Sequence, residues 1–459
     1  MNQISPLPLS IQIRNISRSI GLKLLLVCGL ALFMTIPSLF VGDIVEERTK
    51  RAQDVIQEIS GRTGGQQTFL GPILSIPYTI PRTDKTSLSG VYVVFPTKGE
   101  ATVKVRTEER RRSLFKVPVY QADLRFDAMF DLTGVPSSAP AGAELDWNRA
   151  GLVLGVSDVR GALADGTLTV NGKTNTLVPT DALGSENPRA PLAYFGARVP
   201  DLAKPNATFN VTANLRFSGA QRVAVLAYGK STHFAAEGDW RSPGFDGGFL
   251  PVNRSVSAQG FTGEWSVPFI ARGVPAEGIH TIVSALDHTA MGISFIEVAD
   301  PYQSVNRSIK YALLFVGLLF LSYFVFEATS GKRVHAAQYV LVGVAHMIFY
   351  LLLLSLAERI GFNWGFLLAG GSTVILLSAN AKWIFASTLQ GLRALFVFSL
   401  LYFFIYLLLR LEDNALLVGA VASFLAVAAV MYFTRNIDWY SAISGGGPRA
   451  AEPVKQDGI

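Results

Sequence analysis

The chain has 459 residues, half of them hydrophobic, with 40 Lys and Arg against 34 Asp and Glu and a formal net charge of +6. This length accommodates a membrane bundle together with a separate folded domain. Residues 43–306 carry 26 basic and 27 acidic residues, so the positive excess lies outside that region. Because a nucleic-acid-binding protein concentrates basic residues on a folded domain, this distribution excludes that class, and we expect no nucleic acid partner.

Cysteine and histidine are too sparse to form a metal centre. The single cysteine, Cys28, falls in an apolar segment, so no intrachain disulfide and no thiolate-based site can form. The five histidines are scattered along the chain, without a pair at the spacing of a zinc site: they are His233, His280, His288, His335 and His346. We therefore predict no metal site and no cofactor.

The N-terminal part predicts a membrane anchor. Residues 1–20 are expected to form a cytoplasmic segment, in which residues 1 to about 13 are polar, contain proline and are expected to be disordered. Arg14, Arg18 and Lys23 precede residues 24–41, which contain no charge. A basic segment before an apolar one is typical of a secretory signal. No small-x-small cleavage site follows, so we predict an uncleaved anchor helix over residues 21–42, bent by Pro37 near its exit.

Residues 43–306 are predicted to form an exported, mainly β domain behind a stalk helix at residues 43–60. Apolar residues at helical spacing before Gly61 indicate the stalk. From about residue 69 to 269, apolar and polar residues alternate instead, as along residues 124–132, 209–217 and 261–269. This alternation marks half-buried strands of an antiparallel sheet. We expect a sandwich-like fold, as one domain or two packed subdomains.

Polar clusters divide the predicted strands. The turn predictions are Thr83-Asp84-Lys85, Asp165-Gly166, Asn171-Gly172 and Pro243-Gly244-Phe245-Asp246-Gly247. The charged run at residues 108–112 mixes both signs and predicts a solvated strand end, with a lipid or acidic partner as the alternative. Asp158 and Arg160 are expected to form a structural ion pair, with a binding role as the alternative.

Five apolar segments near the C-terminus are predicted to cross the membrane. Their charge-free cores are residues 311–326, 339–357, 361–381, 394–409 and 415–434. A hydrocarbon core of about 30 Å takes roughly 20 helical residues, and lipid requires each segment to satisfy its own backbone. We predict a domain at 307–434 with transmembrane helices at about 309–327, 338–357, 362–382, 393–411 and 415–434. A cytoplasmic tail is expected at 435–459, with the Gly- and Pro-rich residues 445–459 disordered.

The basic residues set the predicted orientation, because cytoplasmic loops collect Lys and Arg. Arg14 and Arg18 place the N-terminus in the cytoplasm. The spans then alternate, which places further basic residues inside: Lys332, Arg333, Lys382, Arg393, Arg435, Arg449 and Lys455. Both termini are thus expected in the cytoplasm, with residues 43–306 exported.

Two short motifs suggest catalysis, and neither is complete. Ser113-Leu114-Phe115-Lys116 matches the Ser-x-x-Lys motif of penicillin-recognising enzymes, but Ser157-Asp158-Val159 and Lys173-Thr174-Asn175 fall short of the two further elements. Ser372, with Gly370 and Gly371 before it, and His346 both lie within spans, where polar residues suggest function. Ser and Gly also serve as ordinary packing residues between membrane helices. We therefore predict no enzyme and no catalytic residues.

A transporter is disfavoured for a similar reason. Transporters carry charged side chains near mid-membrane or broken helices in corresponding positions. Apart from His346, the span interiors are uncharged, and Glu327, Lys382 and Arg410 lie at span ends. Transport by this chain alone is not expected.

Several stretches carry a resemblance that covers roughly residues 20–440. They are Val45-Glu46-Glu47-Arg48, Gly71-Pro72-Ile73-Leu74-Ser75-Ile76-Pro77-Tyr78, Ser157-Asp158-Val159-Arg160-Gly161, Phe245-Asp246-Gly247-Gly248-Phe249-Leu250-Pro251, Pro301-Tyr302-Gln303, Lys310-Tyr311 leading to Phe326-Glu327, residues 335–343 and 350–356, and Asn436-Ile437-Asp438-Trp439-Tyr440. In combination these resemble the CreD family of bacterial inner-membrane proteins. Two positions depart from its pattern: Gly248 replaces an acid, and Ala336 replaces a proline after the histidine.

The resemblance implies one anchor, a periplasmic domain and a C-terminal bundle, and it suggests a link to envelope stress and antimicrobial response. It implies no enzymatic activity. Gly248 argues against a cation or basic partner at its loop. We expect a non-enzymatic protein that supports envelope integrity through its periplasmic domain, in contact with lipid and with an envelope partner or its own copy. The alternatives are an accessory subunit of an envelope transport or lipid-handling complex and, third, an intramembrane serine hydrolase using Ser372 and His346.

Overall fold

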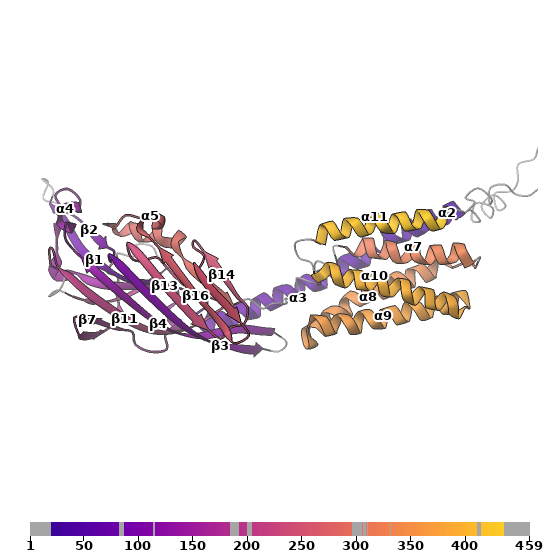
Figure 1. The fold of residues 1–459 in the computed structure, drawn as a ribbon, viewed down its shortest axis with the longest axis horizontal. Coiled ribbons are helices and arrows are strands. Elements are labelled where there is room, and N and C mark those ends of the chain that lie inside the picture. Colours follow the sequence, from indigo (N-terminus) through magenta and orange to yellow (C-terminus); the bar gives the residue numbers. More distant parts are fainter. Residues whose placement is uncertain are drawn as a thin grey trace, which may run out of the picture. The chain divides into compact units, whose positions relative to one another are not determined.

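The computed structural model describes residues 20–81, 87–112, 115–183, 192–199, 204–295, 311–330, 332–410 and 415–435, with the single residues 305 and 309. The chain divides into two compact units, a β unit (Ala52–Val298) and a helical unit (Met1–Arg51 with Ala299–Ile459). In sequence, the β unit is therefore an insertion into the helical unit (Figure 1). An N-terminal apolar helix, a large mainly antiparallel β domain and C-terminal apolar helices confirm the predicted fold class.

The N-terminal apolar stretch forms α2 (Ile20–Phe33) and α3 (Thr35–Arg62), separated by a turn at Met34. Pro37 lies in the first turn of α3, where its missing N–H costs no hydrogen bond within the helix. The interruption thus comes one turn before the proline. The residues predicted as anchor (21–42) and stalk (43–60) are joined, because α3 runs without a break across residue 42 and ends at Arg62.

The β unit contains two sheets. Sheet A has ten strands in the order β14-β18-β12-β1-β6-β10-β9, with β2, β5 and β17 attached beside this path. Sheet B has eight, in the order β15-β16-β13-β3-β4-β11-β7-β8. Neighbours pair antiparallel except β1 with β12 and β3 with β13, which pair in parallel.

The bounds of the strands of sheet A are β1 (Gln67–Pro81), β2 (Ser87–Val94), β5 (Glu144–Leu145), β6 (Gly151–Val156), β9 (Val178–Pro179), β10 (Ala193–Arg198), β12 (Arg222–Val225), β14 (Pro243–Gly247), β17 (Glu277–Ile279) and β18 (Met291–Phe295). Those of sheet B are β3 (Lys98–Arg112), β4 (Phe115–Asp131), β7 (Thr167–Val170), β8 (Lys173–Thr176), β11 (Thr208–Ala220), β13 (Ser231–Gly238), β15 (Asn253–Ser257) and β16 (Gly260–Val267). Short helices connect them: α4 (Val135–Ser138), α5 (Phe269–Arg272) and the 3₁₀ helices η1 (Trp147–Arg149), η2 (Val159–Gly161) and η3 (His280–Thr289).

Both sheets pack on one shared core. The rings of Phe69 in β1 and Phe217 in β11 lie edge to face with centroids 5.3 Å apart. Phe126 in β4 meets Tyr228 in the same way at 5.7 Å. Burial alternates along β11 as the sequence pattern predicts. The arrangement is a two-layer sandwich that holds its own hydrophobic core.

Two predictions in the β region are wrong. Residues 243–247, expected to form a turn, form edge strand β14 paired with β18. Burial contacts outweigh the turn propensity there, because the ring of Phe245 packs 5.8 Å from that of Trp265. Phe269 was expected to continue the alternation of β16, but Pro268 cannot donate to the ladder and ends the strand. Phe269 instead opens α5.

The other turn predictions have mixed outcomes. Asn171 and Gly172 form the tight turn between β7 and β8, both with positive φ, at 48° and 80°. Asp165 and Gly166 lie in a connection between strands, as expected. Thr83-Asp84-Lys85 lies outside the described residues.

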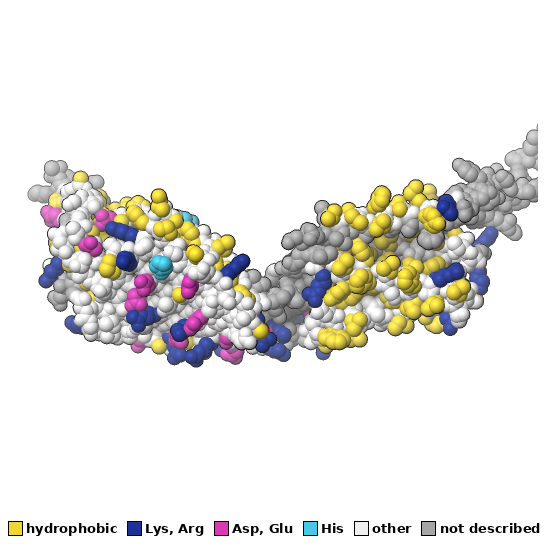
Figure 2. Space-filling model, in the orientation of Figure 1, with side chains coloured by type: hydrophobic (Ala, Val, Ile, Leu, Met, Phe, Trp, Pro, Cys, Tyr) yellow, Lys and Arg dark blue, Asp and Glu magenta, His cyan; other side chains and the backbone are white. Residues whose placement is uncertain are grey.

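The helical unit continues with α7 (Ala312–Ser330), α8 (Ala336–Ile360), α9 (Phe362–Phe385), α10 (Thr388–Arg410) and α11 (Ala415–Thr434). Within the described residues, five helical stretches are long and apolar enough to cross a membrane: Lys23–Arg62 and helices α7 to α10. Figure 2 shows hydrophobic side chains across the visible face of this unit, whereas the visible face of the β unit carries mixed charges. Helix α11 has the bounds of the fifth predicted span, and the exact membrane limits stay a prediction.

The start of α8 explains one departure from the family pattern. His335 caps the helix, and its Nδ1 accepts a hydrogen bond from the Ala337 N–H at 3.2 Å. Ala336 is the first helical residue. Since the first helical position tolerates proline without losing a hydrogen bond, a proline and an alanine serve equally well there.

Candidate functional site

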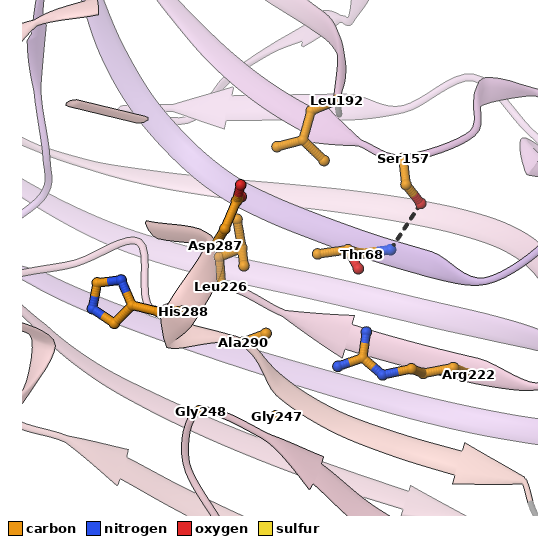
Figure 3. A pocket seen from close by; sticks show the side chains of 10 residues that line it. All are labelled: Thr68, Ser157, Leu192, Arg222, Leu226, Gly247, Gly248, Asp287, His288 and Ala290. Carbon is orange, nitrogen blue, oxygen red and sulfur yellow. Dashed lines mark hydrogen bonds between the residues drawn. The ribbon is translucent and has the colours of Figure 1, made fainter. Parts of the chain in front are cut away.

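The β unit contains a cavity of about 450 Å³ that is shown in Figure 3. Residues from β1, β12, β14, η3 and the connections beside them line it: Thr68, Ser157, Leu192, Arg222, Leu226, Gly247, Gly248, Asp287, His288 and Ala290. Small-molecule sites typically combine such an apolar lining with a few well-placed polar groups. This cavity is therefore our candidate site.

Arg222 supplies the cationic side of the cavity. Its Nε donates to Oδ1 of Asp246 at 2.8 Å, across the intervening strand β18. The β18 residue between them is Gly292, where a Cβ would lie 2.3 Å from that carboxylate oxygen and 2.6 Å from Nη2 of Arg222. Glycine thus leaves the space that this ion pair fills. Nη1 and Nη2 make no hydrogen bond with any described residue, so they are free to meet a ligand.

Two consecutive glycines shape the adjoining wall. Gly247 has a φ of 107°, a conformation that favours glycine. A Cβ on Gly248 would lie 1.7 Å from the carbonyl oxygen of His288. The acid of the family pattern therefore cannot replace Gly248 on this backbone, so this position supplies no carboxylate to the cavity.

Asp287 supplies the anionic side. The residue is exposed at the rim of the cavity, and partial desolvation raises the pKa of its carboxyl above the ordinary value, while neighbouring His288 offsets part of the rise. Within the described residues, the carboxylate has no hydrogen bond and no ion pair. Burial and the nearby Asp287 charge also raise the pKa of Tyr194, which lines an adjacent recess. Asp287 is thus an unpaired acid at the rim of the cavity.

His288 contributes less than its position in the lining implies. Its Nε2 lies 3.3 Å from the carbonyl oxygen of Arg272. In Figure 3 its ring points away from the other side chains, whereas the Asp287 carboxylate lies to the left of Thr68 and the Arg222 guanidinium below it. The two charged groups of Asp287 and Arg222 therefore define the polar character of the cavity.

Buried Arg272 supports this region from behind. Its side chain is fully buried, Nε donates to the Ala227 carbonyl at 3.0 Å, and the guanidinium lies 4.1 Å from the ring centroid of Phe95. Burial lowers its pKa to about 10. Arg272 does not line the cavity; it fastens α5 to the core.

The predicted ion pair of Asp158 and Arg160 is confirmed, and it lies beside hydrogen bonds that connect two strands. Arg160 Nη2 lies 2.6 Å from Asp158 Oδ2 around the turn of η2, and this contact lowers the pKa of Asp158. The buried side chain of Gln67 donates to the Asp158 carbonyl at 2.9 Å. Ser157 Oγ accepts from the Thr68 N–H at 3.0 Å, which fixes one cavity wall. These contacts join β1 to the end of β6.

The charged run at residues 108–112 forms the exposed end of β3, as predicted. Arg112 pairs with Glu58 of α3, and Lys116 Nζ lies 3.9 Å from Glu109. Ser113 and Leu114 of the Ser-x-x-Lys motif lie outside the described residues. Lys116, the last residue of that motif, is exposed on β4.

In the helical unit, Ser372 and His346 do not meet. Both ring nitrogens of His346 are engaged by tyrosine hydroxyls, Nδ1 by Tyr402 at 2.8 Å and Nε2 by Tyr350 at 3.1 Å. The Ser372 hydroxyl donates to the Ala369 carbonyl of its own helix at 3.0 Å. A serine nucleophile needs a base within hydrogen-bond reach. This geometry gives the hydrolase hypothesis no catalytic pair.

Glu327 has a larger role than its position at a span end suggests. It is 8% exposed and forms an ion pair with Lys23 of α2. It also accepts hydrogen bonds from the Val334 N–H at 3.0 Å and the Tyr339 hydroxyl at 3.1 Å. The sequence offered a signal for this pair, because Glu327 and Lys23 lie at span ends that are predicted to be on the same side of the membrane.

The described residues contain no group of three or more His, Cys, Asp or Glu that could hold a metal ion. No sequence motif includes Arg222 or Asp287. Asp246 did fall within a stretch that carries the family resemblance, and its partner Arg222 could have been sought as a cross-strand base. Asp287 lies in a segment without regular periodicity, so no pattern marked it.

Comparison with known proteins agrees with this architecture. The family described as "Inner membrane protein CreD" matches residues 19–440. The chain is also similar to the inner membrane protein CreD of Escherichia coli K12, with 30% identity over 442 residues that cover 94% of this chain and 95% of that protein. The family is named for its membrane location and not for a reaction. The chain therefore belongs to the CreD family of inner-membrane proteins.

Proposed function

We propose that this chain is a non-enzymatic inner-membrane protein that supports cell-envelope integrity by presenting its β unit to an envelope partner in the periplasm. The observation that carries this proposal is that the polar side chains of the two units are engaged differently. The singled-out polar side chains of the bundle make contacts inside it, whereas the β unit holds a cavity lined by Arg222, whose Nη atoms have no described partner, and by the unpaired Asp287.

The bundle supports a packing role. His346, Ser372 and Glu327 are each engaged by neighbouring groups of the same unit. Intramembrane polar residues are functional candidates by default because burying them is costly. Here their contacts satisfy them, and they join α2, α7, α8 and α10. This favours an anchor over a catalyst or an ion pathway.

The distribution of basic residues supports a periplasmic β unit. Lys23 at the start of α2, Lys332 between α7 and α8, and Arg435 after α11 belong to ends on one predicted side of the membrane. The opposite connections carry a basic residue beside acids. Cytoplasmic ends collect Lys and Arg, so the first side is the cytoplasm, and residues 43–306 are periplasmic.

Crosslinking in living cells tests the proposal. A photoreactive residue replaces Leu250, which is 66% exposed and lies two residues beyond cavity residue Gly248. The matched control places it at Lys173 in the exposed β7–β8 hairpin. We expect an adduct with an envelope protein or a second copy from position 250. Adducts confined to cytoplasmic proteins would refute the proposal. A transport or lipid-handling complex as the adduct would identify the accessory-subunit form of this role.

A further inference from the structure

We propose that the β-unit cavity binds a small zwitterion of the amino-acid or short-peptide class, with its carboxylate on Arg222 and its ammonium group on Asp287. This inference rests on the proposed function and names the ligand chemistry of the same site. It follows from the two charged groups, their unused bonding capacity and the apolar surface between them.

Arg222 is suited to a carboxylate. Its Nε is held by Asp246 at 2.8 Å, so the orientation of the guanidinium plane is fixed. Nη1 and Nη2 remain without a described partner. Arginine binds carboxylates through paired N–H donors, and such charge-assisted hydrogen bonds are about twice as strong as neutral ones. Because the residue is positioned before a ligand arrives, little side-chain entropy is lost on binding.

Asp287 is suited to an ammonium group. It lies at the cavity without a hydrogen bond to any described residue, and a carboxylate without partners gains most from a cation that donates to it. The ring of Tyr194 lies in the recess that shares Leu192 with this cavity. Aromatic faces attract ammonium groups as well. This side of the cavity therefore selects a cation.

The lining between the two ends selects the rest of the ligand. Leu192, Leu226 and Ala290 provide an apolar surface, and the cavity of about 450 Å³ falls within the size range of small-molecule sites. A simple anion would bring negative charge toward Asp287, and a simple cation would bring positive charge toward Arg222. A molecule with one charge of each sign and an apolar middle complements both ends.

Titration calorimetry on the detergent-solubilised full-length protein tests this assignment. The probes are the tripeptide Ala-Leu-Ala, its N-acetylated form and its C-terminal amide. We expect the free tripeptide to bind and each blocked form to bind about tenfold more weakly, the loss expected for one charge-assisted contact. This comparison needs no variant, so it cannot fail through misfolding.

Variants then assign each end. R222Q should lower the affinity for the free tripeptide about tenfold but leave the affinity for the amide almost unchanged. D287N should likewise lower the affinity for the free tripeptide about tenfold but leave the affinity for the acetylated form almost unchanged. The matched control is R216Q, which removes a similar Arg–Asp pair, at 2.9 Å from Asp123, on sheet B. R216Q should leave the affinity for all three probes unchanged. Equal binding of all three probes, or no binding, overturns the ligand assignment. If position 250 still crosslinks to an envelope protein, the proposed function survives that result.

Discussion

Lys23 and Glu327 stand 304 positions apart in sequence and form an ion pair in the helical unit, between α2 and α7. The same ammonium group donates to the Val334 carbonyl at 2.8 Å. The Glu327 carboxylate accepts from three donors in total, which come from α2, α8 and the connection before α8. The N-terminal helix is therefore part of the bundle and not only an anchor.

Breaking this pair should destabilise the bundle. Replacing Glu327 by Gln leaves the partly buried Lys23 charge without its partner, and we expect a loss of about 1–3 kcal/mol, less than for a fully buried pair because Lys23 keeps some contact with solvent. The double variant K23M/E327M should lose less stability than the sum of the losses of K23M and E327M, because removing both charges leaves neither unpaired. Thermal unfolding in detergent measures the loss of stability of each variant. Additive losses would show that the two residues act independently.

The contact between His346 and Tyr402 should matter for packing. Y402F removes the hydroxyl that engages His346 Nδ1, and we expect a loss of about 1–3 kcal/mol, the cost of an unsatisfied buried polar group. The control is Y406F, whose hydroxyl makes an exposed contact with Asn363 at 3.3 Å. It should cost less than about 0.5 kcal/mol.

S372A should leave stability and envelope phenotype unchanged, and loss of phenotype at normal protein level would revive a catalytic serine.

Gly161 should tolerate no side chain. A Cβ there would lie 2.4 Å from the Ser218 carbonyl oxygen and 2.5 Å from the Gln67 amide nitrogen, both of which belong to a buried network. We expect G161A to cost about 1–3 kcal/mol through overpacking. At Gly61 in α3, nothing lies within 4 Å, and G61A should be neutral or stabilising by up to about 1 kcal/mol. Equal effects of the two substitutions on the unfolding temperature would contradict the packing described here.

Asp287 should cost stability at neutral pH. Its pKa is raised in the folded protein, so the folded state is penalised for carrying the charge, and this penalty grows as the pH rises through the folded pKa. D287N should therefore unfold at a higher temperature than the natural protein at pH 7. The difference should vanish below the ordinary carboxyl pKa of 3.8, where both states are protonated. His288 and Arg222 are the basic residues that line this cavity, and Tyr194 lies in the adjacent recess. A stabilising effect that does not change with pH would contradict this account.

Periodicity predicted the fold class well, because the constraints behind it are strong. Alternation along residues 124–132 and 209–217 fixes which side chains of β4 and β11 face the core. Long uncharged runs have few alternatives to membrane helices. Local turn signals were weaker evidence: Gly and Pro at 243–247 gave way to the packing of Phe245 on Trp265.

The candidate site was beyond prediction from the sequence for a physical reason. Arg222 and Asp287 line one cavity, and Asp246 pairs with Arg222, because β12, β14 and η3 converge in the tertiary structure, and no spacing along the chain encodes that arrangement. The need for glycine at position 248 could not be predicted from the sequence either. Its identity is explained by the His288 carbonyl, 40 residues later in the chain, and not by its neighbours in sequence.

Cysteine accessibility in intact cells tests most directly whether a bundle in the inner membrane holds the β unit in the periplasm. With Cys28 replaced by Ser, a single cysteine replaces either exposed Lys173 of the β unit or exposed Arg333 between α7 and α8. A maleimide that cannot cross the inner membrane should label position 173 in cells with a permeabilised outer membrane, and position 333 only after the inner membrane is lysed. The reverse pattern would contradict the account.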